Sequence, residues 1–387
     1  MPGFELYGPD ERAAILAWFD SNNGVMFAHG YDALRKGVFK VREFEREVAR
    51  RLDSPYALAV SNGSAAILVA LRALGVRRSD EIITSAFTFV ATAEAIIEAG
   101  ATPVFAEVDA SLNLDPADVA RRITPRTRVI IPVHMAGAPA DLDAILALAR
   151  AHGLVVLEDT AQAFGGTYHG RHLGTLGDAG TLSFDFAKNI TTGEGGMVVT
   201  ARRELFEAAR AYHDHGHEYN PTLPRGRDTR SRPGFNFRMT EVQAVLGLTQ
   251  LKKLEFILAR QRANKAVIKN GMAGCGFEFR YLHDEKGEIG DSLIFFLPNE
   301  AAAGTFARKL SDRGLGTKNL PDALIWHYAG TWRHLFGDFP ALANCERLWP
   351  RTDALLRRAI ALSIMLRMED ADFDRVITSV REIAKQL

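Results

Sequence analysis

The hydrophobic and polar positions of this chain follow two patterns. Apolar residues recur at helical spacing over residues 10–22 and 40–52. From about residue 55, seven short β-branched or apolar runs predict strands, and helix-like stretches separate the first five. The predicted strands are YALAVS (56–61), EIITSA (81–86), TPVFAEV (102–108), TRVIIPV (127–133), LVVLEDT (154–160), GTLSFD (180–185) and GMVVT (196–200). Strands that alternate with helices predict an α/β fold with a mostly parallel sheet covered on both faces.

The second half of the chain has a different pattern. The segment 207–238 is rich in His, Arg, Gly and Pro, which predicts a long functional loop. A long helix is predicted from about Thr240 to Asn270, with Thr240 as its N-cap. Two strand-like runs, FEFRYL and SLIFFLP, then mix with three helices. We therefore expect a large domain over 1–240, with the first helices included, and a smaller α+β domain over 241–387.

Composition narrows the classes of partner. The 47 Lys and Arg residues balance the 47 Asp and Glu residues, so the chain has no overall attraction to nucleic acid or anionic membrane. The first residues lack a basic segment followed by an apolar run, and the longest apolar runs are too short to span a bilayer. Cys275 and Cys345 are too few for a disulfide framework or a cysteine-held metal cluster. We expect a cytoplasmic protein without nucleic-acid or membrane partners.

The first candidate ligand site follows the first predicted strand. Ligands of an open parallel sheet bind at the carboxyl ends of its strands. There the turn Asn62-Gly63-Ser64 opens a helix, whose first backbone amides and dipole favour an anion such as phosphate. The Gly-x-Gly-x-x-Gly pattern is absent from this turn, which disfavours a dinucleotide.

Asp159 ends the fifth predicted strand, within Glu158-Asp159-Thr160-Ala161-Gln162. A buried carboxylate must pair with something, because an isolated one is costly. One interpretation is an Asp that caps the next helix. The other is an Asp that pairs with a protonated ring nitrogen, since charges about 3 Å apart attract by roughly 5 kcal/mol at a dielectric of about 20, before desolvation.

Lys188 follows the sixth strand, five residues after Ser183 and just before a glycine-rich turn, Gly193-Glu194-Gly195-Gly196. A lysine between two core strands is often only a surface residue. The glycine-rich turn, however, lets the backbone approach a ligand closely. A desolvated lysine with a lowered pKa is the usual partner of an aldehyde in Schiff-base chemistry.

Taken together and in this order, these motifs resemble a known family. They are the strand–Gly-Ser–helix turn, Glu-Asp-x-Ala-Gln, Ser-Phe-x-x-x-Lys-x-x-Thr-x-Gly-Glu-Gly-Gly and Gly-Phe-Asn-Phe-Arg (234–238) before the helix at Thr240. The chain resembles the sugar aminotransferases of the DegT/DnrJ/EryC1/StrS family over nearly its whole length. The resemblance implies the fold-type I architecture of pyridoxal 5'-phosphate (PLP) enzymes, with a seven-stranded sheet and a smaller C-terminal domain.

The resemblance also implies roles for individual residues. Lys188 would hold PLP covalently and then shuttle protons, and Asp159 would pair with the pyridine nitrogen. Phe89 would stack on the ring, with plain core packing as its alternative, and Gln162 would bind near the ring hydroxyl. The phosphate would be held by Gly63, Ser64 and Ser183.

Two residues of the Gly-Phe-Asn-Phe-Arg segment have implied roles between subunits and toward substrate. In the family, the Asn of this segment reaches the phosphate of the neighbouring subunit, so Asn236 predicts a homodimer with shared active sites. A turn residue is the alternative for Asn236. Arg238 is a candidate for binding the carboxylate of the amino donor.

Histidines supply the remaining candidates. The cluster His213-Asp214-His215-Gly216-His217 has alternate histidines that could chelate a metal, but no further ligand set accompanies it. We therefore predict no metal and place His215 and His217 in the lining of the substrate pocket, with a solvated loop as the alternative. His327 is a similar pocket candidate.

The predicted reaction is transfer of an amino group from an amino acid, glutamate by resemblance, to a keto or aldehyde sugar. The stretches MPGFEL, Val133–Gly137 and Asp214–His217 look most like a subgroup that makes 8-amino-3,8-dideoxy-octulosonate, and a nucleotide-linked sugar is an equal alternative. A PLP-dependent lyase or aldolase, or a non-catalytic regulator, are rival classes. Family members that act as sugar dehydratases carry histidine at the lysine position, so Lys188 argues against that branch.

Overall fold

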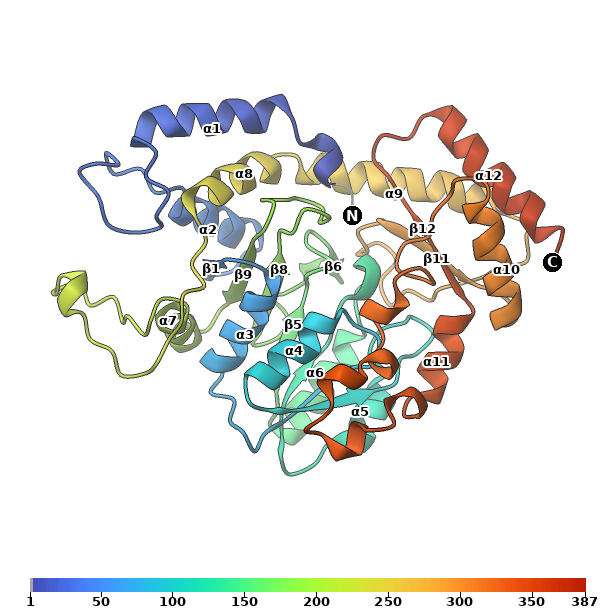
Figure 1. Cartoon of the computed structure of the whole chain (residues 1–387), viewed down its shortest axis with the longest axis horizontal. Helices are drawn as coiled ribbons and strands as arrows, with labels where there is room; N and C mark the ends of the chain where they lie inside the picture. The colour runs from blue at the N-terminus through green and yellow to red at the C-terminus, as the bar shows by residue number, and fades with distance from the viewer. Residues whose placement is uncertain (1–2) are drawn as a thin grey trace.

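A seven-stranded sheet forms the centre of the computed structural model, which describes residues 3–387 (Figure 1). Its strand order is β1-β9-β8-β5-β4-β2-β3, and only β9 runs antiparallel to its neighbours. The strands are β1 Tyr56–Val60, β2 Glu81–Ser85, β3 Thr102–Ala106, β4 Thr127–Ile131, β5 Val155–Asp159, β8 Ala179–Ser183 and β9 Gly196–Thr200. The predicted mostly parallel sheet is confirmed.

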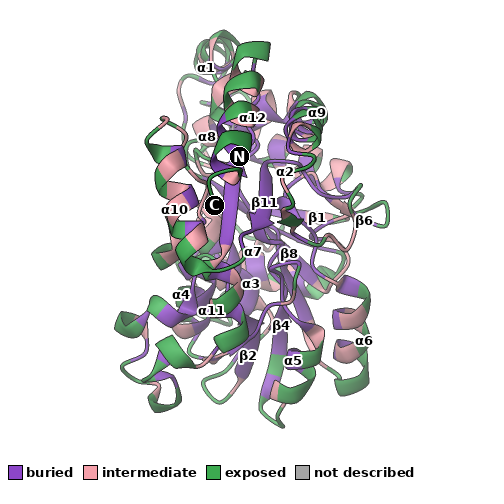
Figure 2. Cartoon of the chain, turned by 90° about the vertical axis from the view of Figure 1, so that its right-hand side faces the viewer, coloured by how far each residue is buried: buried purple, intermediate pink, exposed green. Residues whose placement is uncertain are grey.

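Helices cover both faces of this sheet, which is why its strands are apolar on both sides (Figure 2). Successive residues of a strand point to opposite faces. Accordingly, Ile82 packs in the cluster under α3 and α4, whereas Ile83 packs under α5 and α6. The helices of this unit are α1 Pro9–Asn22, α2 Lys40–Arg51, α3 Gly63–Ala73, α4 Val90–Glu98, α5 Pro116–Arg122, α6 Leu142–His152, α7 Arg203–Tyr212 and α8 Glu241–Leu251, and a small hairpin joins β6 Thr167–Tyr168 to β7 Arg171–His172.

A smaller unit packs beside the sheet, at the right of Figure 1. Its antiparallel sheet has the order β10-β11-β12, and its own apolar cluster lies between that sheet and the flanking helices. The elements are α9 Leu254–Gly271, β10 Glu278–Phe279, β11 Ser292–Phe296, α10 Glu300–Ser311, α11 Pro350–Arg357, β12 Ala359–Ser363 and α12 Asp370–Ala384. The sequence pattern predicted two strands here and missed β12, because this short run directly follows a helix.

Two further expectations need correction. The predicted loop 207–238 begins too early, since α7 continues to Tyr212. The predicted single helix from Thr240 to Asn270 is two helices, α8 and α9, which are interrupted at Lys252 and Lys253. The Lys253 ammonium donates to Leu6 O at 2.8 Å and to a Glu11 carboxylate oxygen at 2.7 Å, tertiary contacts that helical periodicity does not report.

Thr240 is the N-cap of α8, as predicted, and Gln243 completes a capping box by accepting from the Thr240 amide at 2.7 Å. The domain boundary near residue 240 stays a prediction. The packing of α8 against α1 and α2 favours a boundary further along, within α9.

Short 3-10 turns fill several connections. They are Gly3–Leu6, Met135–Gly137, Arg225–Arg227, Leu324–Trp326, Ala329–Thr331, Arg333–Leu335, Pro340–Leu342 and Cys345–Arg347. Over residues 3–387, no helix is both long and apolar enough to cross a membrane.

Candidate active site

A cavity of about 770 Å³ lies where the carboxyl edge of the large sheet meets loops of the smaller unit. This volume is typical of a small-molecule site. Eight residues expected from the sequence line it: Lys188, Asp159, Gly63, Ser64, Phe89, Gln162, Ser183 and His327. The loop after β8, the ends of β5 and β8 and the starts of α3 and α4 bring most of them together, because parallel strands end at one edge.

Asp159 is buried at the end of the central strand β5, with 3% of its surface exposed. Its Oδ2 accepts from Thr92 Oγ1 at 2.8 Å, and its Oδ1 accepts from the Ala161 amide at 3.1 Å. Burial raises the pKa of Asp159, while these hydrogen bonds and the charge of Lys188 act in the opposite direction. A cation placed in the cavity would therefore stabilise the ionised form of this carboxylate.

Glu158, the neighbour of Asp159 on β5, points to the other face of the sheet. Its carboxylate is fully buried and accepts from three backbone amides, those of Gly174, Leu176 and Gly177, at 2.6 to 2.8 Å. His134 Nδ1 accepts from a backbone amide, so the ring carries its proton on Nε2. The Glu158 carboxylate accepts a further hydrogen bond from this Nε2, at 3.1 Å. Of the two acids, Glu158 is therefore structural and Asp159 faces the cavity.

Glu158→Gln should lower the free energy of unfolding by about 3 kcal/mol or more. Each carboxylate oxygen accepts two hydrogen bonds, and the amide nitrogen of glutamine would face donors. Denaturant unfolding measures the change. Glu204→Gln, at an exposed glutamate of α7, is the control and should unfold like the parent. Equal midpoints for the two variants would contradict this account.

Lys188 lies on the loop after β8, at the wall of the cavity. Burial lowers the pKa of its ammonium group, against the opposing charges of Asp185 and Asp159. Its backbone amide donates to Asp185 O at 3.0 Å, and its carbonyl accepts from the Gly3 amide at 3.0 Å. The loop is thus held on both sides, and the amine has access to its neutral, nucleophilic form.

The start of α3 closes one end of the cavity. The Asn62 side chain caps the helix by accepting from the Ala65 amide at 2.7 Å, and the first amides of a helix have no intrahelical acceptor. Gly63 lies so close to Ser183 that a Cβ at Gly63 would be 2.8 Å from Ser183 Cβ. Only glycine permits this approach, which brings the helix N-terminus and the Ser183 hydroxyl to one place suited to an anion.

Gln162 and Phe89 complete this side of the cavity. Gln162 Oε1 accepts from the Ala136 amide at 3.0 Å, so its NH2 group is the part available as a donor. Phe89 is 42% exposed and its ring lies 5.4 Å from that of His327. A ring this exposed is not a plain core residue, and its stacking role stays a prediction.

His327 is the one predicted pocket histidine that lines the cavity. Burial lowers its pKa, so the ring is neutral at pH 7. Its Nδ1 lies 2.9 Å from Ala323 O, which requires the proton on Nδ1 and leaves Nε2 as an acceptor. Such a nitrogen suits a hydroxyl group of a ligand.

The other candidates lie outside the lining of this cavity. Arg238 forms an ion pair with Asp214, which Arg225 also contacts at 2.6 Å. His217 Nδ1 lies 3.1 Å from a carboxylate of the same loop region, while His215 and Asn236 are exposed. Over residues 3–387, no group of three or more His, Cys, Asp or Glu side chains is arranged to hold a metal ion.

Sequence reasoning missed several residues of the cavity. Phe4, Thr92, Asp185, Glu194, Asp291 and Lys318 also line it. The segment around Phe4 is held across the rim, because the Gly3 amide donates to Lys188 O and the Glu5 carboxylate accepts from the Leu366 amide at 2.9 Å. The Glu194 motif was visible in the sequence, but neither the residues of the smaller unit nor Phe4 had a local signal.

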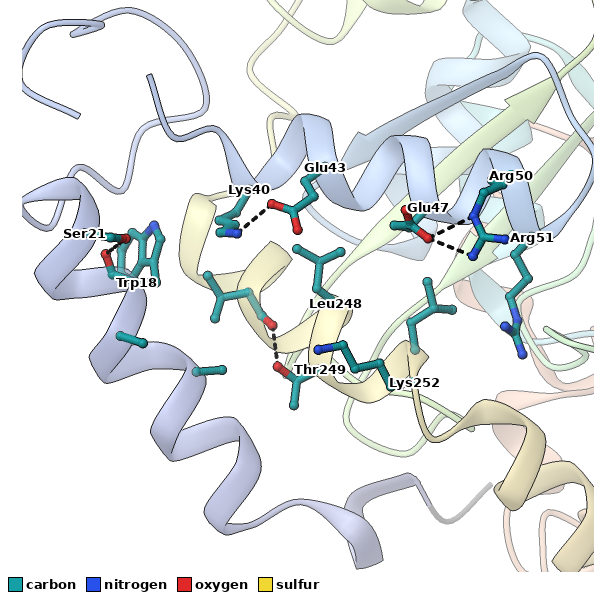
Figure 3. A pocket seen from close by; sticks show the side chains of 14 residues that line it. Trp18, Ser21, Lys40, Glu43, Glu47, Arg50, Arg51, Leu248, Thr249 and Lys252 are labelled. Carbon is teal, nitrogen blue, oxygen red and sulfur yellow. Dashed lines mark hydrogen bonds and ion pairs between the residues drawn. The ribbon is translucent and has the colours of Figure 1, made fainter. Parts of the chain in front are cut away.

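A second hollow, of about 540 Å³, lies between α1, α2 and α8 (Figure 3). Its charged side chains pair locally, with Lys40 Nζ 2.6 Å from a Glu43 oxygen and Arg50 2.9 Å from one of Glu47. None of the residues predicted to carry chemistry line it. The cavity at Lys188 is therefore the candidate active site.

Comparison with known proteins agrees with this geometry. Residues 29–381 match the model of the DegT/DnrJ/EryC1/StrS aminotransferase family. The spore coat polysaccharide biosynthesis protein SpsC of Bacillus subtilis (strain 168) is 36% identical over 367 residues, which cover 91% of each chain. An aminotransferase from Psychrobacter cryohalolentis is 30% identical, with a TM-score of 0.87 over 98% of each chain. DesI, solved in the presence of its TDP-sugar product, is 30% identical, with a TM-score of 0.80 over 97% of this chain and 91% of that one.

The family model spans most of the sequence, and these relatives cover nearly the whole fold. The predicted fold-type I architecture and the predicted aminotransferase class are thereby confirmed. This chain belongs to the DegT/DnrJ/EryC1/StrS aminotransferase family, whose members are PLP-dependent.

Proposed function

We propose that this aminotransferase moves the amino group of an amino acid to a keto or aldehyde group of a sugar. The proposed amino donor is L-glutamate. One observation carries the proposal: Lys188, Asp159 and the start of α3 face a single cavity large enough for cofactor and substrate. The relatives support a sugar acceptor, since one serves polysaccharide biosynthesis and another was solved with a TDP-sugar. A nucleotide-linked sugar and an eight-carbon sugar acid are the two acceptor classes we propose.

The residues of the cavity fit PLP at three points. The bare Cα of Gly63 lets the N-terminus of α3 approach Ser183 closely, so that the first helix amides and the Ser183 hydroxyl could hold one phosphate together. Asp159, whose pKa is raised by burial, would hold a proton on the pyridine nitrogen. The Gln162 NH2 group, oriented by the Ala136 amide, would donate to the ring oxygen.

Each residue then has a defined task. PLP, when bound, supplies the electron sink for breaking a bond at the donor's α-carbon. Lys188 Nζ, freed when the donor amine takes its place, would take the proton from that α-carbon as general base and, as general acid, give up a proton at a different carbon from the one that lost it. The same exchange in reverse would place the amine on the acceptor. His327 Nε2, a neutral acceptor, would orient a sugar hydroxyl.

Absorbance spectroscopy of the purified holoenzyme tests the proposal. L-Glutamate should convert the lysine-bound cofactor to the pyridoxamine form and release 2-oxoglutarate, and a keto sugar should restore the first spectrum. A PLP spectrum that does not respond to glutamate or glutamine would favour the rival lyase or aldolase class. No cofactor signal after addition of PLP would refute the assignment.

A homodimer with shared active sites is also part of the proposal. Asn236 and Phe235 are exposed. Their segment lies beside the turn that begins α3, because the Ser61 amide donates to Phe237 O at 2.7 Å. An exposed Asn beside an exposed aromatic ring favours a contact with a second copy. The cytoplasmic location expected from the sequence stays a prediction.

Complementation between subunits tests this sharing. Asn236→Ala should weaken PLP binding about 10-fold or more, the loss expected for a hydrogen bond to a charged group. At a PLP concentration that leaves Asn236→Ala largely without cofactor, mixing it with Lys188→Ala should restore activity, because one site of each mixed dimer then has both residues. Random exchange should recover about a quarter of the wild-type sites. Activity no higher than that of Asn236→Ala alone, after exchange verified by mass spectrometry, would show that Asn236 serves its own chain.

A further inference from the structure

We infer that Lys318, on the smaller unit, binds the carboxylate group of a substrate inside the cavity that contains Lys188. The inference rests on the proposed amino transfer and adds to it a residue that selects substrates by charge. The carboxylate could belong to the amino donor or to a sugar acid, and the experiment below separates these two sources.

The fold places the Lys318 side chain firmly. Its backbone amide donates to Ala361 O of β12 at 2.8 Å, so the residue is fixed to the edge of the smaller sheet. Only 12% of the side chain is exposed, and it lines the cavity together with Asp291, at the start of β11. The ammonium group pairs with Asp291 Oδ2 and lies 3.3 Å from Asp291 O.

The charges of the cavity leave few groups that could receive an anionic substrate. Four carboxylates line it, those of Asp159, Asp185, Glu194 and Asp291, but among the described residues only two ammonium groups and no guanidinium group do so. The ammonium group of Lys188 is the one that reacts with the cofactor. Of the cations among the described residues of the lining, Lys318 is therefore the one placed to meet a substrate carboxylate in this acidic surrounding.

Two other residues considered as candidates present no charge to the cavity of their own chain. Arg238, expected to bind the donor's carboxylate, is paired with Asp214 outside this lining. His327 is neutral and its Nδ1 proton is directed at Ala323 O, so the ring presents an acceptor and no charge. An ammonium group has three hydrogens in all directions around the nitrogen, so Lys318 can bind Asp291 and a second carboxylate together.

Calorimetry on the resting holoenzyme measures the binding without turnover. The probe is 2-oxoglutarate, which carries the donor's two carboxylates but no amine to transfer. Lys318→Met should raise its dissociation constant about 10-fold or more, the loss expected for one charge-assisted hydrogen bond. Lys318→Arg, which keeps the charge, should recover part of the affinity. The KM for L-glutamate should rise in parallel, with a smaller effect on kcat.

A double variant separates binding from stability. Lys318→Met alone removes the ion pair that Lys318 makes with the fully buried Asp291, which can destabilise the fold. Asp291→Asn with Lys318→Met removes both charges and should show the same loss of 2-oxoglutarate affinity. Arg313→Met with Glu382→Gln is the control, because that ion pair, at 3.1 Å, belongs to the same unit but lies outside the lining. The control should bind 2-oxoglutarate like the parent.

Comparing two probes identifies the substrate whose carboxylate Lys318 binds. Weaker binding of 2-oxoglutarate to the Lys318 variants assigns Lys318 to the amino donor. Unchanged 2-oxoglutarate affinity with weaker binding of 3-deoxy-octulosonate, an eight-carbon sugar acid, assigns it to the acceptor. Affinities within twofold of the parent for both probes would overturn the inference and leave Lys318 as the counter-ion of Asp291 only. The response of the parent's spectrum to L-glutamate tests the amino transfer separately.

Discussion

Lys188→Ala is expected to lower kcat for amino transfer by about 10⁴-fold or more, the upper range for a positioned acid–base group. In the proposed mechanism, the variant loses both the amine that would hold the cofactor and the group that would move the α-proton. It should nevertheless fold and retain PLP without a covalent bond, because the start of α3, Ser183 and Asp159 are unchanged. Stopped-flow absorbance with L-glutamate measures the half-reaction.

Two comparisons make this prediction specific to Lys188. Lys309→Ala, at a lysine of α10 that contacts Gln386 at 2.7 Å, should keep the rate of the parent. Added methylamine should accelerate the Lys188→Ala half-reaction, since a small amine can occupy the space and act as the base. A Lys188→Ala enzyme within tenfold of the parent would move the proton-transfer role to another residue.

The cofactor side of the cavity could be predicted because its residues carry local signals. Lys188, Asp159 and Gly63 each lie at or after the end of an apolar run, and these runs end at the same sheet edge. Strand periodicity was therefore enough to predict that the three residues lie close together. The family resemblance then supplied roles that periodicity could not.

The substrate side could not be predicted, for physical reasons. Lys318 and Asp291 lie on loops of the smaller unit, where an isolated Lys or Asp has the pattern of a surface residue. Their proximity depends on how β11 and β12 pair and on how the two units meet, and both are long-range contacts. Arg238 shows the converse: its motif was recognised, but its charge is directed at Asp214, a contact no local pattern reports.

The helix break at Lys253 has the same cause. The run from Thr240 to Asn270 is continuously helical in its periodicity, yet it is interrupted at Lys253, whose ammonium donates to Leu6 O and to Glu11 of α1. Local propensity predicted the helices correctly, but it cannot report contacts with a segment so distant in the sequence.

Asp159→Asn is expected to lower kcat by about 10² to 10⁴-fold while the fold and the cofactor's phosphate contacts persist. Asparagine keeps the shape and the contact with the Ala161 amide but removes the negative charge. A charge about 3 Å from a protonated ring nitrogen is worth roughly 5 kcal/mol at a dielectric of about 20, before the cost of desolvation. Without that charge, the protein would no longer favour a proton on the ring nitrogen, and the electron sink that PLP supplies would weaken.

Thr92 offers a graded test of the same idea. Its hydroxyl donates to Asp159 Oδ2 at 2.8 Å and so favours the ionised carboxylate, whose pKa burial raises. Thr92→Val should therefore slow the half-reaction by about 10-fold, the loss of one hydrogen bond to a charge, and Thr92→Ser should not. In the Asp159→Asn background, Thr92→Val should add little, because the charge it supports is gone. Additive losses in that cycle, measured by stopped-flow absorbance, would show that Thr92 acts independently of the Asp159 charge.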